Sequence, residues 1–285
     1  MITRPNCKIN LGLRVVRRRA DGYHDLESFF VPVPLCDTLE IVPADHFDFV
    51  QDGIAIDAAT EDNLVVRAYR LMQREYGSRV GTVAIKLTKN IPFGAGLGGG
   101  SSDAAFTIRM VNDLFELQQQ PETLCKLAAR IGADCPFFIV DKPAYVTGIG
   151  DMMAPVDSNP IAGLRLVMAM PDATVSTAEA YRGIVPRESR PTPMPDEMPL
   201  LDALQQPITT WNSNVTNDFE HTVFKAHPVI RELKEAFLAD GAQYASMSGS
   251  GASVFALYDP TRQPSASIGH YGHIILNTVV TDTLS

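Results

Sequence analysis

Two hydrophobic patterns alternate along the chain. Apolar and polar residues alternate strictly in residues 82–87, which is typical of a half-buried strand. Apolar residues three and four positions apart mark residues 65–76 and 104–111 as amphipathic helices. The chain therefore contains both kinds of element, and a polar residue, Asp62 or Asn63, stands where the first helix needs an N-cap.

The beginning of the chain predicts a hairpin. Strand patterns cover residues 6–16 and 26–33, and the turn sequence Ala20-Asp21-Gly22 separates them. Lys8 stands within the first, apolar strand, so its ammonium is either paired with an anion or on a solvated strand face. Further strands are expected at 39–41, 47–49 and 164–170, and further helices at 121–131 and 228–239.

The stretch 92–105, PFGAGLGGGSSDAA, carries the clearest chemistry. Glycine permits positive φ and close approach of a ligand to the backbone, so successive N–H groups can converge on one anion. The helix expected to follow, as far as Leu117, would add its own unpaired N–H groups and the positive end of its dipole. These features together predict a phosphate cradle.

Other glycine-rich loops fit less well. A Walker loop needs lysine before the serine, and Gly100 precedes Ser101. Gly94, Gly96 and Gly99 match the G-x-G-x-x-G spacing of a dinucleotide fold, but this alternative leaves both serines unexplained. A flexible linker would not be flanked by an alternating strand and an amphipathic helix.

Composition narrows the class of protein. The chain has 285 residues, of which 45% are hydrophobic, a formal charge of -9 and a pI near 5.1, so a general nucleic-acid surface is not expected. The basic run Arg17-Arg18-Arg19 is either a solvated turn or a site for an anionic substrate. Four cysteines without a paired framework, and no apolar run long enough for a membrane span, predict a cytoplasmic protein with reduced thiols.

Motifs along most of the chain resemble those of the GHMP kinases. The glycine loop is similar to their signature loop, and residues 4–11 resemble an N-terminal P-A-K-[IL]-N-L motif, with Asn6 for proline and Cys7 for alanine. Residues 132–137 are similar to G-A-D-x-P-F, and residues 246–256 resemble the third kinase motif. Residues 21–24, D-G-Y-H, resemble a motif of the member whose substrate is a cytidine diphosphate sugar-alcohol.

This resemblance implies a fold and a reaction. The fold would be α+β with two domains, a ribosomal-protein-like N-terminal domain in residues 1–150 and a ferredoxin-like C-terminal domain in residues 151–285, with the active site between them. The reaction would move the ATP γ-phosphoryl group to a substrate hydroxyl. The alternatives are a homoserine or mevalonate type of GHMP kinase, a decarboxylase of the same fold, and a non-catalytic ligand sensor.

The resemblance also assigns roles to residues. Asp134 would be the catalytic base and Lys8 its charged partner. Tyr23 and Tyr181 would stack on the two faces of the cytosine, and His24 would recognise its edge. The remaining substrate-binding residues would be Asn10, Thr177, Gly249 and Ser250. The ATP-binding residues would be Asn63, Lys89, Pro92, Gly94, Gly96, Leu97, Gly98, Gly99, Gly100, Ser101 and Ser102.

The expected cofactors and partners follow from the same resemblance. ATP would carry Mg²⁺ on its own oxygens and water, with Ser101 or Ser102 as possible contacts, because no carboxylate cage for a metal is visible in the sequence. The partner is a small-molecule substrate, with no nucleic acid and no membrane, and the protein would be a monomer or homodimer. The proline-rich stretch 186–199 is predicted to be a surface loop.

Overall fold

A computed structural model describes residues 1–55, 59–190 and 198–281. It contains three four-stranded sheets and helices, so the predicted α+β class is confirmed. The chain forms two compact units, and each is made of several segments. Unit 1 comprises residues 1–7, 34–93 and 98–142, and unit 2 comprises residues 8–33, 94–97 and 143–285.

The first sheet lies in unit 1, with the strand order β1-β4-β6-β5. Its strands are β1 (Ile2–Thr3), β4 (Thr38–Pro43), β5 (Asp48–Gly53) and β6 (Val83–Lys89). The strands pair antiparallel except for β5 and β6, which run parallel. The expected strands at 39–41, 47–49 and 82–87 are therefore present, with ends shifted by a few residues.

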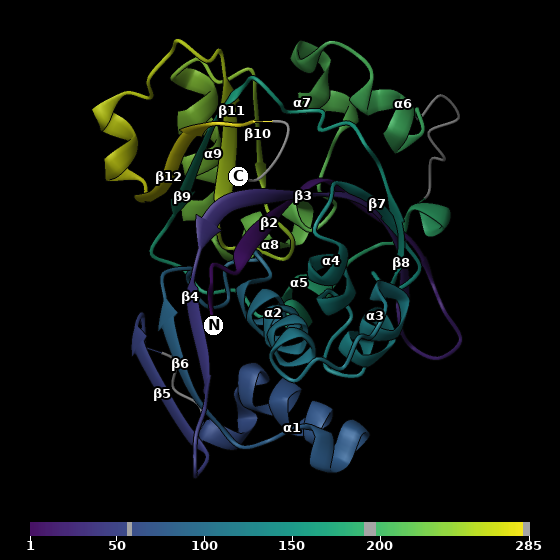
Figure 1. The fold of residues 1–285 in the computed structure, drawn as a ribbon. Helices are drawn as coiled ribbons and strands as arrows, with labels where there is room; N and C mark the ends of the chain where they lie inside the picture. Colours follow the sequence, from purple (N-terminus) through teal and green to yellow (C-terminus); the bar gives the residue numbers. More distant parts are fainter. Residues whose placement is uncertain (56–58, 191–197, 282–285) are drawn as a thin grey trace. The chain divides into compact units, whose positions relative to one another are not determined.

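Helices α1 (Leu64–Tyr76) and α2 (Gly99–Leu114) pack on one another and lie on the same side of this sheet (Figure 1). The predicted cap is confirmed, because Asn63 Oδ1 accepts a hydrogen bond from Val65 N at 2.9 Å. The buried face of α1 repeats at helical spacing through Val65, Tyr69 and Met72. The amphipathic pattern thus places this helix against its neighbours.

The end of α2 differs from the sequence prediction. The helix ends at Leu114 and does not reach Leu117. Glu116 and Gln118 have positive φ, which a helix cannot accommodate, and Leu117 N turns back to Asn112 O. Helix α3 (Pro121–Ala129) likewise ends two residues before Ile131, and the apolar run that follows Asp134 forms the short helix α4 (Cys135–Val140).

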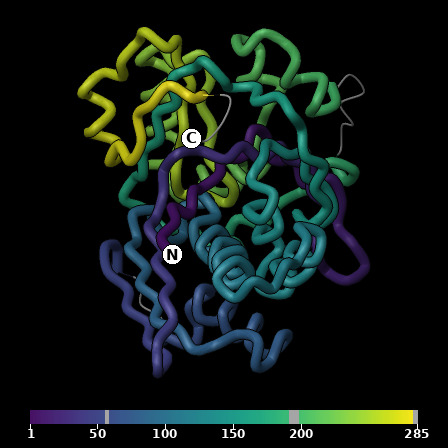
Figure 2. The backbone as a smooth tube through the Cα atoms, viewed as in Figure 1, coloured from purple at the N-terminus to yellow at the C-terminus, as the bar shows by residue number. Residues whose placement is uncertain are grey.

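The β2–β3 hairpin, drawn in purple in Figure 2, belongs mainly to unit 2. Its strands β2 (Asn6–Arg18) and β3 (His24–Cys36) belong to a sheet of order β2-β3-β7-β8, with β7 (Ala144–Thr147) and β8 (Met152–Pro155). Arg19 N bonds to Tyr23 O, which closes the predicted turn. The turn around Gly150 joins β7 to β8 within unit 2, and the division of the chain into domains 1–150 and 151–285 stays a prediction.

The third sheet, of order β10-β11-β9-β12, is also in unit 2 and is antiparallel throughout. Its strands are β9 (Arg165–Met170), β10 (Tyr244–Met247), β11 (Val254–Tyr258) and β12 (His273–Val279). The remaining α-helices are α5 (Thr177–Tyr181), α6 (Leu200–Leu204), α7 (Trp211–Asn214), α8 (Glu220–Ala226) and α9 (Pro228–Ala239). Short 3-10 turns lie at Thr60–Asp62, Gly77–Arg79, Arg187–Ser189, Ile208–Thr210 and Ala266–His270.

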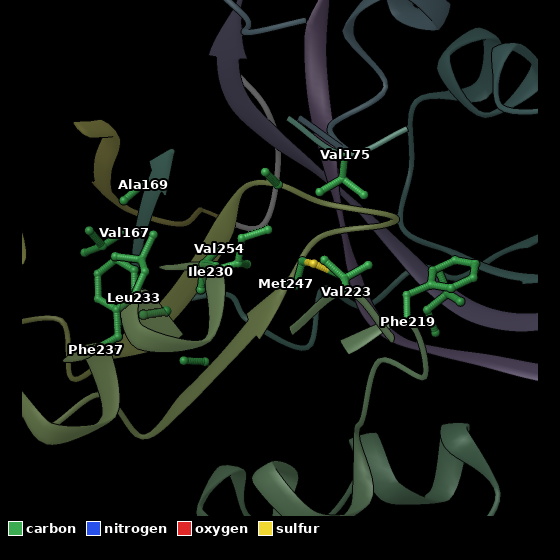
Figure 3. Close-up of a cluster of buried hydrophobic side chains, with 14 of the residues drawn as sticks. Val167, Ala169, Val175, Phe219, Val223, Ile230, Leu233, Phe237, Met247 and Val254 are labelled. Atoms are coloured by element: carbon green, nitrogen blue, oxygen red, sulfur yellow. The ribbon is translucent and has the colours of Figure 1, made fainter. Parts of the chain in front are cut away.

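A buried core joins α9 to the third sheet (Figure 3). Ile230, Leu233 and Phe237 recur every three or four residues and pack against Val167 and Val254 of the sheet. Removing these side chains from water is the main favourable contribution to the stability of this unit. The core thereby holds the turn between β10 and β11 in place.

Three further sequence predictions concern the loop 186–199, membrane spans and the cysteines. The expected loop 186–199 contains a 3-10 turn at Arg187–Ser189, and its residues 191–197 lie outside the described residues. In the described part of the chain, no helix is long and apolar enough to cross a membrane. All four cysteines, Cys7, Cys36, Cys125 and Cys135, are free thiols.

Candidate active site

The tip of the glycine loop, Gly94–Leu97, is held by other segments of unit 2. Lys8 N donates to Leu97 O at 3.0 Å, and Ser253 Oγ donates to Ala95 O at 2.6 Å. Ser248 Oγ donates to Gly96 O at 3.1 Å. The tip therefore has a defined conformation, and its carbonyls are bonded to the protein.

Two glycines are required where the loop meets the β10–β11 turn. Gly96 has φ +73°, and a Cβ there would lie 2.0 Å from Ser248 O. Gly249 has φ +56°, and its Cβ would lie 2.9 Å from Gly96 O and 3.4 Å from Asn10 Oδ1. Both residues were predicted site residues from distant parts of the sequence, and the structure brings them together with Asn10.

Gly96→Ala is expected to raise KM for ATP about 10- to 100-fold, because the backbone around Ser248 must move to accept the new Cβ. Gly183→Ala is the matched control. Gly183 has φ +80° but nothing within 4 Å of its Cβ, so it experiences the same backbone strain without the clash. Steady-state kinetics on both variants would test this. The same KM for ATP in Gly96→Ala and Gly183→Ala would contradict the expected effect of the close contact at Gly96.

Lys8 is buried, with 3% of its surface exposed, so a position on a solvated strand face is wrong. Its Nζ donates to Asn10 Oδ1 at 2.5 Å and to Gly96 O at 3.1 Å, and it lies 4.6 Å from the centroid of the Phe30 ring. These contacts supply oxygen atoms and a π face to the buried ammonium. They place its charge beside the tip of the glycine loop.

Asn10 is positioned by a short chain of hydrogen bonds. Its Nδ2 donates to Ser28 Oγ at 3.0 Å, and Ser28 Oγ donates to Gly12 O at 2.6 Å. In the β10–β11 turn, Ser250 Oγ lies 3.5 Å from Thr177 Oγ1. Unit 2 therefore gathers Lys8, Asn10 and the predicted residues of the third motif around one loop.

Two predicted substrate residues, His24 and Tyr181, form an aromatic group on unit 2. The His24 and Tyr181 rings stack with centroids 4.9 Å apart and an interplanar angle of 20°, and Phe219 meets Tyr181 edge-on. Tyr23 is 62% exposed and presents its ring to solvent. One face of Tyr181 is thus covered by His24, and the stacking of a base between Tyr23 and Tyr181 stays a prediction.

Burial, and secondarily the charge of Arg18, hold the pKa of His24 below its usual value. The imidazole is therefore neutral at neutral pH, with one ring nitrogen as donor and the other as acceptor. A neutral imidazole suits recognition of a base edge that carries both donors and acceptors. It would gain a second donor only as the pH falls below this lowered pKa.

In unit 1, helix α2 begins directly after Gly98, which adopts the left-handed conformation. Ser102 N bonds to Gly98 O at 2.9 Å, so the preceding N–H groups begin the helix without that intrahelical bond. Ser101 is half-buried, whereas Ser102 is fully buried and its Oγ has no hydrogen-bond partner within the described residues. A buried hydroxyl in this state is suited to a ligand oxygen or an ordered water.

Asp134 lies in the same unit, immediately before α4. Its side chain does not cap that helix, although the residue occupies the N-cap position. The next residue, Cys135, shares a hydrogen bond with Ser101, and burial raises the pKa of this thiol to about 11. The segment that carries Asp134 is therefore packed against the first turn of α2, and the role of Asp134 as base stays a prediction.

Asn63 and Lys89 have structural partners. Asn63 caps α1 and donates through Nδ2 to Gln51 Oε1 at 3.0 Å. Lys89 is buried and forms ion pairs with Asp37 and Asp103. Their assignment to ATP stays a prediction. Pro92 is half-buried before the loop tip, and Gly100 packs near Leu64 of α1.

The structure adds residues that sequence reasoning did not single out. Ser248 and Ser253 bond to the loop tip, and Asn217 Nδ2 donates to Met247 O and Gly249 O at 2.8 Å each. Both serines stand inside a quoted motif, but the pattern does not show which carbonyls they meet. Asp37, before β4, carries no local signal at all. No group of three His, Cys, Asp or Glu side chains that could hold a metal occurs in the ranges that the structure covers.

Comparisons with known proteins identify the family of the chain. Residues 63–142 match the model of the GHMP kinases N terminal domain, and residues 200–267 match that of GHMP kinases C terminal. The chain is 46% identical over 259 residues to 4-diphosphocytidyl-2-C-methyl-D-erythritol kinase of Parabacteroides distasonis, covering 91% of this chain and 92% of the relative.

Solved structures give the same result. A crystal structure of 4-(cytidine 5'-diphospho)-2C-methyl-D-erythritol kinase superposes with a TM-score of 0.80 at 31% identity, covering 96% of this chain and 97% of the other. Homoserine kinase from Cytophaga hutchinsonii superposes with a TM-score of 0.62 at 17% identity, covering 93% and 87%, which shows a shared fold.

Proposed function

The chain belongs to the GHMP kinase family, and we propose that it phosphorylates the 2-hydroxyl of 4-diphosphocytidyl-2-C-methyl-D-erythritol with ATP. The products are the 2-phosphate and ADP, in a step of non-mevalonate isoprenoid biosynthesis. The observation that carries this proposal is the combination, in unit 2, of a hydrogen-bonded glycine-loop tip beside Lys8 and the stacked rings of His24 and Tyr181, with the exposed Tyr23 next to His24 in the sequence. The first suits phosphates, and the second suits a nucleobase.

Asp134 is the proposed base. A carboxylate close to the attacking hydroxyl can accept its proton as the new P–O bond forms. Asp134 sits on a segment packed against the first turn of α2, where the glycine loop delivers its N–H groups. Lys8 is proposed to counter the negative charge that develops during the transfer, because its buried ammonium acts in a medium that screens charge weakly.

The glycine loop is proposed to hold the ATP phosphates. Its backbone donors are Gly94, Gly96, Gly98, Gly99 and Gly100 with the two serines that follow. Bound Mg²⁺ would neutralise phosphate charge, and Ser101 is the more accessible serine for it, whereas Ser102 fits a buried oxygen. The chain's own contribution is to orient the phosphates and exclude water.

Tyr23→Ala is expected to raise KM for the cytidine substrate about 10-fold while leaving kcat and KM for ATP within about twofold, since base stacking contributes roughly 1–3 kcal/mol. The ring is exposed, so its removal leaves the fold intact. Tyr271→Ala is the control, an exposed tyrosine in the third-sheet region. Substrate-dependent ADP formation measures both, and an unchanged KM in Tyr23→Ala would exclude Tyr23 from the base site.

The function itself is tested by ADP production with ATP and Mg²⁺. The arms contain the cytidine substrate, mevalonate, homoserine or no acceptor. ADP formed with the cytidine compound alone supports the proposal. ADP with another acceptor would keep the family and reject this substrate, while ATP binding without any ADP would favour a ligand sensor.

We also infer that the protein works in the cytoplasm, in keeping with its four free thiols.

A further inference from the structure

Three buried ionisable side chains lie where the glycine loop begins and ends. Lys89 is the last residue of β6, Asp103 lies in α2 and Asp37 precedes β4. At most 3% of each is exposed. Lys89 Nζ donates to Asp103 Oδ2 at 2.7 Å and also to Asp37 Oδ2. All three belong to unit 1, and Lys89 and Asp103 bracket the loop between them.

Asp37 also holds the first residues of the loop. Its Oδ1 accepts from Asn90 N at 2.6 Å and from Ile91 N at 2.8 Å. The start of α2 closes on the same point, because a Cβ on Gly99 would lie 2.8 Å from Ile91 Cγ2 and 3.4 Å from Lys89 Nζ. The two ends of the loop are therefore joined through side chains and backbone, with Lys89 in the middle.

The two acids have different roles in this cluster. One ammonium cannot balance two buried carboxylates, and a buried excess charge is costly. Burial raises the pKa of Asp103 to about 8, against the charge of Lys89 and together with that of Asp37. The hydrogen bonds differ in the same sense: Asp37 accepts from three donors through its two oxygens, whereas Asp103 accepts from Lys89 through Oδ2 and its Oδ1 has no hydrogen-bond partner among the described residues.

We propose that Lys89, Asp37 and Asp103 form an ionic clasp that sets the shape of the glycine loop, so that Lys89 is a positioning residue for the nucleotide and does not itself touch ATP. This inference rests on the proposed function of the loop in binding ATP. A charged residue directly before a phosphate loop would ordinarily be read as a phosphate ligand. Here both of its buried partners are carboxylates of the protein.

The asymmetry between the two acids gives the test. Asp37→Asn replaces an acceptor-only group by one with an N–H₂ that must face a donor, so KM for ATP is expected to rise about 10- to 100-fold. Asp103→Asn keeps an oxygen that can accept from Lys89, and its amide takes the place of an oxygen that has no partner, so KM for ATP should stay within about twofold, whereas Asp103→Ala removes the acceptor and should raise it about tenfold. KM for the cytidine substrate should change less than twofold in all three.

Asp52→Asn is the matched control. Asp52 of β5 pairs at 3.1 Å with Lys86, which lies on β6 like Lys89, but both side chains are about half exposed, so KM for ATP should not change. Titration calorimetry with ATP alone, and thermal unfolding, accompany the kinetics. If Asp37→Asn does not fold, the comparison of Asp103→Ala with Asp103→Asn still tests the clasp. A KM for ATP that is equal in these two variants would contradict it.

Lys89→Met separates positioning from direct contact. If Lys89 only positions the loop, the double variant Lys89→Met/Asp37→Asn should lose no more ATP affinity than the single variant with the larger loss. The reason is that either substitution alone already breaks the clasp. Additive losses would show that Lys89 contacts ATP and would overturn the proposal, as would lower unfolding temperatures with unchanged ATP affinity. Wild-type protein that binds no ATP would overturn the proposed function and the clasp with it. Wild-type protein that binds ATP normally, with additive losses in the double variant, would overturn the clasp alone.

Discussion

Asp134→Ala is expected to reduce kcat about 10²- to 10⁴-fold, the usual contribution of a positioned general base. The substrate hydroxyl keeps its proton at neutral pH, and without a carboxylate its attack on the γ-phosphorus has no proton acceptor nearby. Binding of both ligands should be nearly unchanged, because in the proposed site backbone N–H groups hold the phosphates and aromatic rings hold the cytosine. Steady-state ADP formation and titration calorimetry with each ligand measure the two parts separately.

The controls for this prediction use the same region. Asp134→Asn keeps the size of the side chain and should lose turnover to the same extent, since an amide cannot accept the proton. Glu122→Gln alters an exposed acid in the first turn of α3 and should retain full activity. Normal turnover in Asp134→Asn would reject Asp134 as the base and return it to the role of a helix-start residue.

Lys8→Met should lower kcat about 10²- to 10³-fold, the range seen when one preorganised group that stabilises transition-state charge is removed. Methionine is nearly isosteric and fits the buried position beside Phe30, so the charge is lost with little change in packing. The variant also leaves Asn10 Oδ1 and Gly96 O without their Nζ donor, which should lower the unfolding temperature. Single-turnover rates and thermal unfolding test both effects.

Lys126→Met is the control for this variant, since Lys126 is an exposed lysine in the last turn of α3. It should change the single-turnover rate by less than about twofold and leave the unfolding temperature unchanged. A Lys8→Met protein with a lowered unfolding temperature but an undiminished rate would make Lys8 a structural residue of the loop tip only. A rate loss at saturating ATP and acceptor would support its role in the transfer step.

Local pattern predicted much of the fold. The hairpin around Asp21-Gly22, helix α1 with its Asn63 cap and the loop leading into α2 depend on side chains a few residues apart, so periodicity and turn chemistry identify them. The end of α2 was missed because positive φ at Glu116 and Gln118 is uncommon for such residues and leaves no sequence mark. The three-sheet arrangement was also beyond reach, because strand order depends on long-range pairing.

By itself, the sequence determined the family to which this protein belongs. A glycine loop with two serines, a lysine within an apolar strand and an aromatic pair at a turn are recognisable because each motif is contiguous and its chemistry lies in the residue types. The tertiary structure alone decided which buried donor meets which acceptor. Ser248 reaches Gly96 across 152 positions and Lys89 reaches Asp37 across 52, and such pairs arise from the packing of whole segments, since buried polar groups need partners wherever the fold supplies them.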